Sequence, residues 1–87
     1  MSVEFTGALV KEQGIEFMII LVKKNIIDNH FQRQNAVNEY QRLFGIPSII
    51  AAQDSRGDFK YFGREDISRF LSSIHPSRIS WSTFRFG

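Results

Sequence analysis

The chain has 87 residues, of which 43% are hydrophobic and 23% are charged, and a net charge of +2. Its length suits a single domain, residues 1–87, because separate hydrophobic cores normally need about 100 residues each. The absence of cysteine excludes disulfide bonds, thiol catalysis and cysteine-based zinc or iron–sulfur sites. A net charge this small does not indicate a polyanionic partner.

Neither a secretory signal nor a membrane span is expected from the sequence. The first ten residues lack the basic start and apolar run that a signal peptide would show. The longest apolar run, residues 17–22, is much shorter than the roughly 20 residues that cross a bilayer. We therefore expect a soluble protein of the cytoplasm with no membrane partner.

The first part of the chain predicts a β-hairpin. Residues 3–11 alternate between apolar and polar side chains, as a half-buried strand does. Gln13 and Gly14 supply a turn, and residues 15–24 form the returning strand. From Phe17 onward this second strand is apolar on both faces, which predicts a central strand covered on both sides.

A helix is predicted between the second strand and Pro47. Its apolar residues have helical spacing and form one stripe: Ala36, Val37, Tyr40, Leu43 and Phe44. Asp28 or Asn29 can cap the start of this helix by accepting a bond from a free backbone N–H. Gly45 can adopt the left-handed conformation that ends many helices.

The stretch QDSRGDFKYFGRED, residues 53–66, contains an Arg-Gly-Asp triplet. Asp54 can bond to the backbone two residues on, and Gly57 tolerates positive φ, so the triplet predicts a turn. The strands on either side are residues 48–53 and 58–62. The turn explains the Arg-Gly-Asp triplet by local backbone structure, and we favour this explanation over a cell-adhesion signal.

A second helix is predicted after Gly63, and an aromatic tail follows it. Acidic residues occupy its first turn, and its apolar stripe is Ile67, Phe70, Leu71 and Ile74. His75 and Pro76 end the helix. The tail, residues 78–87, is expected to be either an edge strand whose rings cap the second face of the sheet or an arm that contacts a partner.

The order of these elements predicts an α+β fold. Two strands, a helix, two strands, a helix and the C-terminal strand or arm follow one another, a ββαββα pattern. We expect a two-layer sandwich with a four- or five-stranded, largely antiparallel sheet and two helices on one face.

The sequence offers no constellation for catalysis or for a cofactor. The two histidines, His30 and His75, stand alone, whereas a zinc site needs three or four convergent ligands. Serines surround His75, but sequence neighbours rarely form a catalytic dyad. A glycine-rich phosphate loop is also lacking. We therefore expect no catalytic residues, metal or cofactor, and we favour a protein that is not an enzyme.

The number of aromatic residues is the most informative feature for function. Nine Phe, two Tyr and one Trp exceed what so small a core readily hides. We expect a small accessory or interaction module that binds a protein partner or a second copy of itself, as a homodimer. Its predicted contact surface combines the rings and cations of the tail: Trp81, Phe84, Phe86, Arg78 and Arg85.

The alternative is a domain that binds single-stranded nucleic acid. The segment RGDFKYFGR is loosely similar to the basic-Gly-aromatic submotif of RNA-recognition-motif domains, although Asp58 stands where that family has its first aromatic residue. Under this hypothesis rings stack on bases and cations hold phosphates, through Phe59, Tyr61, Arg56, Lys60 and Arg64. A half-buried hairpin whose rings face the core is the simpler explanation, because aromatic residues are common in strands.

Overall fold

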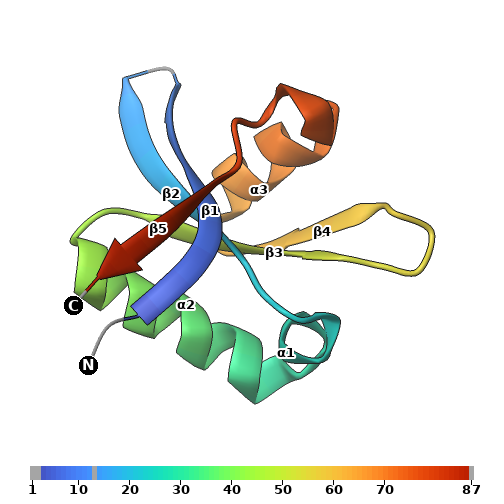
Figure 1. The fold of residues 1–87 in the computed structure, drawn as a ribbon, viewed down its shortest axis with the longest axis horizontal. Helices are drawn as coiled ribbons and strands as arrows, with labels where there is room; N and C mark the ends of the chain where they lie inside the picture. Colours follow the sequence, from blue (N-terminus) through green and yellow to red (C-terminus); the bar gives the residue numbers. More distant parts are fainter. Residues whose placement is uncertain (1–2, 13, 87) are drawn as a thin grey trace.

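The computed structural model describes residues 3–12 and 14–86, and the side chains of Val3 and Phe86 lie outside that description. Figure 1 shows the elements in space. In chain order they are β1 (Val3–Glu12), β2 (Ile15–Leu21), α1 (Lys24–Asp28), α2 (His30–Phe44), β3 (Ser48–Gln53), β4 (Phe59–Phe62), α3 (Glu65–Ser72), the single 3₁₀ turn η1 (Pro76–Arg78) and β5 (Ser82–Phe86).

The five strands form one mixed sheet in the order β4-β3-β2-β1-β5. Three of the neighbouring pairs are antiparallel, and the pair β2–β3 is parallel. The parallel pair arises because α1 and α2 carry the chain back along the sheet before β3 begins, as a crossover connection requires. The expected α+β class and the largely antiparallel sheet are therefore confirmed.

The two longer helices cover opposite faces of the sheet (Figure 1). On the α3 face, Ile67 and Leu71 pack against strand residues that include Ile49. On the α2 face, Val37 packs with Ile50, the next residue of β3. The structure thus corrects the expected placing of both helices on one face. The reason lies in β2 and β3, which are apolar on both faces and need cover on both sides.

The local signals in the sequence have the structural roles that their chemistry predicts. Asn29 caps α2, since its side-chain oxygen accepts a bond from the N–H of Gln32 at 2.9 Å. Gly45 ends α2 in the left-handed conformation, with φ of 72°. Both features set the direction in which the chain enters and leaves α2, and therefore how α2 lies across the sheet.

Candidate functional site

The aromatic tail docks on its own domain. Trp81 precedes β5 and packs against the core on the α3 face, where it is partly buried. Its ring stacks on Phe59 with centroids 5.5 Å apart, and Phe59 stacks on Tyr61 at 6.2 Å. The structure thus has the tail as an edge strand of the sheet, with the ring of Trp81 packed on the α3 face.

Phe84 lies on the opposite face of the sheet from Trp81. Its ring stacks on that of Phe5 with centroids 5.4 Å apart, next to Tyr40 and Phe44 of α2. The next residue of β5, Arg85, forms an exposed ion pair with Glu4 at 2.7 Å. The rings of Trp81 and Phe84 therefore both contribute to packing within the domain.

The predicted partner-binding residues are accordingly divided among several places. Trp81 faces α3, Phe84 faces α2, and Arg85 pairs with the neighbouring strand. The side chain of Phe86 lies outside the described residues. Arg78 is exposed in η1 and has no ion-pair partner among the residues that the structure describes. Of the two cations in the predicted partner-binding set, Arg85 is paired and Arg78 remains available to a partner.

The residues of the nucleic-acid hypothesis are also divided between faces. Phe59 and Tyr61 turn toward α3 and stack on each other, and burial raises the pKa of the Tyr61 hydroxyl. Lys60 lies between them in β4 and points to the other face, where it pairs with Asp28. Arg64 pairs with Asp66. Lys60 and Arg64 are therefore paired, and Lys60 lies on the face opposite the two rings, whereas Arg56 is exposed at the turn before β4 and has no ion-pair partner among the described residues.

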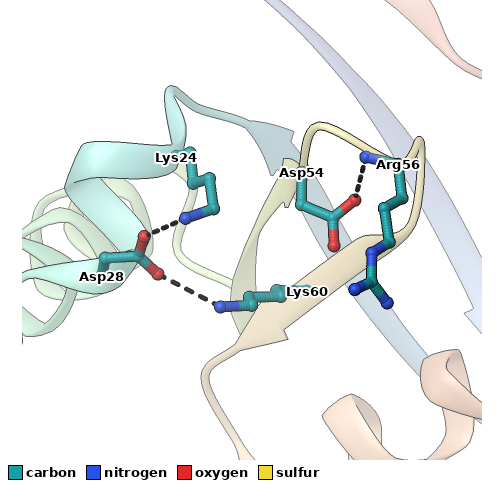
Figure 2. A network of polar contacts seen from close by, with 5 residues as sticks. All are labelled: Lys24, Asp28, Asp54, Arg56 and Lys60. Carbon is teal, nitrogen blue, oxygen red and sulfur yellow. Dashed lines mark hydrogen bonds and ion pairs between the residues drawn. The ribbon is translucent and has the colours of Figure 1, made fainter.

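The Arg-Gly-Asp triplet forms the predicted turn. The Asp54 carboxylate accepts bonds from the backbone N–H groups of Arg56 at 2.9 Å and Asp58 at 3.0 Å. Gly57 has φ of 88°, which a residue with a Cβ rarely adopts. Figure 2 shows the bond from Arg56 to Asp54 at this turn. The structural interpretation of the triplet is confirmed.

A small polar network joins α1 to β4 (Figure 2). The Asp28 carboxylate accepts bonds from the Lys24 ammonium at 2.8 Å and from the Lys60 ammonium at 3.4 Å. The bond from Lys24 is the main cause of a lowered pKa of Asp28, and Lys60 adds to it, whereas partial burial opposes it. The same bond raises the pKa of Lys24.

The stabilising contribution of Asp28 is expected to depend on pH. Because folding lowers the pKa of this carboxyl, the stabilisation is present above the unfolded pKa of about 4 and is lost as pH falls through the folded value. Asp28→Asn should therefore destabilise the protein slightly at neutral pH, and the difference from the wild type should shrink below about pH 4. Urea unfolding of both proteins at neutral pH and below about pH 4 measures this difference in the free energy of unfolding. An equal difference at the two pH values would show that the Asp28 carboxylate does not stabilise the fold through its charge.

The histidines have local structural contacts. The Ser77 backbone N–H donates to His75 Nδ1 at 3.1 Å, and Ser77 Oγ lies 2.7 Å from the same nitrogen. His75 therefore caps η1. His30 begins α2 and lies 3.2 Å from the guanidinium of Arg33. Within residues 3–12 and 14–86, no three His, Asp or Glu side chains are placed to hold a metal ion.

An open strand edge is the feature that sequence reasoning missed. β1 is ten residues long, but β5 pairs only with its first half, Val3 to Gly7. The second half, residues 8–12, pairs with β2 on its inner side and has no strand on its outer side among the described residues. The β1–β2 hairpin consequently projects beyond the start of β5 (Figure 1). The sequence carries no signal for it, because the predicted strand (residues 3–11) and the tail (residues 78–87) are nearly equal in length, and only the structure shows that β5 begins at Ser82.

The backbone of this edge is directed outward at alternate residues. Glu12 and Ile15 flank the turn and pair with each other, so the backbone groups of Glu12 face β2. Pairing alternates along an antiparallel strand, and the N–H and C=O groups of Leu9 and Lys11 therefore face away from β2. These four groups can bond to another strand.

A groove runs along the same edge. It has a volume of about 360 Å³ and lies between residues 9–12 of β1 and the segment from α3 to η1, with Phe70, Ile74, Arg78 and Ile79 in its wall. Leu9 is 53% exposed and is one of three large apolar side chains with high exposure in the described residues. The open edge, defined as residues 8–12 of β1, thus combines free backbone groups, apolar surface and the cation of Arg78.

Comparisons with protein-family models, with curated proteins and with solved structures give no match for this chain. None of the helices in the described part has the length and hydrophobicity that a bilayer span requires.

Proposed function

We propose that the protein is a cytoplasmic, non-enzymatic interaction module that binds an extended segment of a partner protein along the open edge. The observation that carries this proposal is the ten-residue strand β1 whose outer side is occupied by β5 over only five residues. An exposed strand edge offers a row of backbone donors and acceptors to another chain. Strand addition of this kind is a common way of recognising peptides.

The surroundings of the open edge suit an added strand. Backbone groups of Leu9 and Lys11 would supply the hydrogen bonds, which give affinity with little dependence on sequence. Side chains of the added strand would point alternately to the two faces of the sheet. On one face they would meet Phe70 and Ile74 in the groove, and on the other the exposed side chain of Leu9. Arg78 would favour a partner with a carboxylate.

The tail residues keep an indirect role under this proposal. Trp81 and Phe84 anchor the chain on opposite faces of the sheet, just before and within β5. They therefore fix where β5 begins, and the start of β5 sets one end of the open edge. No observation favours the nucleic-acid alternative, because Lys60 and the rings of β4 face opposite sides.

Lys11→Pro tests the proposal, because it removes the backbone N–H of residue 11, which faces away from β2 toward the added strand. A phage-displayed library of dodecapeptides is selected on the immobilised protein after depletion on Lys11→Pro, and selected peptides are synthesised with a fluorescent label. Affinity, measured by anisotropy, should fall about tenfold in Lys11→Pro because one backbone bond is lost. Proline suits this position because the Lys11 N–H does not pair with β2.

Lys11→Ala is the matched control, since it removes the same side chain and keeps the backbone N–H. Its affinity for the selected peptides should equal that of the wild type. A selection that enriches no peptide, or peptides that bind Lys11→Pro as well as the wild type, would refute strand addition at this edge.

A further inference from the structure

We infer that the segment that occupies the open edge is the open edge of a second copy of this chain, so that two β1 strands join two sheets into one. This inference rests on the proposed function and names its partner. Beyond the start of β5, residues 8–12 of β1 have no neighbouring strand on their outer side in the described part of the chain. The end of the β1–β2 hairpin therefore projects beyond β5 and leaves a space beside it where β5 does not reach. The projection of one copy therefore matches the space beside the hairpin of the other in length, as a two-fold interface requires.

The alternation of backbone groups fixes the register of this pairing. Antiparallel strands exchange bonds between residues whose N–H and C=O groups both face the partner. Leu9 and Lys11 are those residues, and Leu9 therefore lies opposite the partner's Lys11. By the same two-fold symmetry Val10 lies opposite the partner's Val10, and Ala8 opposite the partner's Glu12.

Charge favours this register. The partner's Glu12 comes beside Ala8, on the face where Ala8 packs with Ile79. Arg78 precedes Ile79 and lies in the same groove, so the partner's carboxylate approaches a cation that has no ion-pair partner among the described side chains. Symmetry forms this pair twice. No like charges face each other directly across the junction.

Apolar contact favours it as well. Leu9 lies on the same face as Lys11 because the two are separated by two residues along β1. In the paired state the exposed Leu9 side chain is covered by the aliphatic stem of the partner's Lys11 and lies diagonal to the partner's Leu9. The pairing thus removes apolar surface and an unpaired strand edge at the same time.

A single cysteine tests the register, because the chain has none of its own. In a non-hydrogen-bonded pair the two Cα atoms lie about 4.5 Å apart, within the range that a disulfide spans. Val10→Cys should therefore form a disulfide-linked dimer with oxidised glutathione. Glu12→Cys is the matched control, since its two copies would lie about 14 Å apart along the paired strands. Equal cross-linking of both variants would refute the register.

Sedimentation equilibrium from micromolar to millimolar concentration tests the association itself. The wild type and Lys11→Ala should show a monomer–dimer equilibrium. Lys11→Pro should raise the dimer dissociation constant about a hundredfold, because two symmetry-related backbone bonds are lost at about tenfold each. A wild type that stays monomeric overturns this inference. If the selected peptides still bind this monomer at the open edge, the proposed peptide binding stands and only the self-association is refuted. If the peptides do not bind either, the proposed function and the self-association are both refuted.

Discussion

Phe5→Ala is expected to lower the free energy of unfolding by about 3–5 kcal/mol, the usual effect of deleting a buried Phe ring. The Phe5 side chain is 8% exposed. Its ring centroid lies 6.0 Å from Tyr40, 5.5 Å from Phe44 and 5.4 Å from Phe84. This one ring therefore links β1 to both α2 and β5, and its removal would leave a cavity where three elements meet. Urea unfolding followed by circular dichroism measures the change.

Phe31→Ala is the matched control for this substitution. Phe31 lies in the first turn of α2, and its side chain is 83% exposed. Its removal should change the free energy of unfolding by less than about 0.5 kcal/mol, as is usual for surface positions. If both variants lost the same stability, Phe5 would not hold the three elements together.

Truncation after Ser77 is expected to abolish cooperative unfolding. The deletion removes the buried Ile79, worth roughly 1.5–3 kcal/mol, and the partly buried rings of Trp81 and Phe84, each of which contributes a part of such a value. It also removes every backbone bond between β1 and β5. The free energy lost with these side chains and backbone bonds is comparable with the total stability of a domain, roughly 5–15 kcal/mol. Thermal melting with near-ultraviolet circular dichroism should show no transition.

Arg85→Ala in the full-length chain controls for the loss of charge in the tail. Arg85 and Glu4 form an exposed ion pair, and such pairs contribute about 0–1 kcal/mol. This variant should therefore unfold cooperatively, close to the wild type. A truncated chain that still melts cooperatively would show that the tail is not part of the folded core.

The elements governed by local chemistry were predicted correctly from the sequence. The helix cap, predicted at Asp28 or Asn29 and found at Asn29, depends on a bond set within a few residues, as do the φ value of Gly45 and the turn at Asp54. The two-sided apolar pattern of β2 likewise predicted a central strand, and β2 lies in the middle of the sheet. The short helix α1 was missed, because its five residues carry too little periodicity to be recognised.

The features that depend on distant parts of the chain could not be predicted. Element order alone does not say which face of the sheet α3 covers. The sequence predicted that the rings of the tail could cap one face of the sheet, but not that Trp81 and Phe84 would pack on opposite faces against Phe59 and Phe5. The open edge depends on where β5 stops beside β1, which is a matter of register between strands far apart in sequence. The candidate site was therefore missed, although Arg78 within it was named.

The pairing of Val3 with Phe86 has a consequence for how the protein is made. During translation β1 emerges long before β5, and the outer side of β1 stays bare along its whole length until the rest of the sheet has been synthesised. A nascent chain is most prone to aggregate while such an edge is unpaired. A circular permutant of residues 1–87, with a short linker from β5 to β1 and the chain opened at the tip of the β3–β4 hairpin, would place β5 directly before β1, so that the newly made edge is covered almost at once.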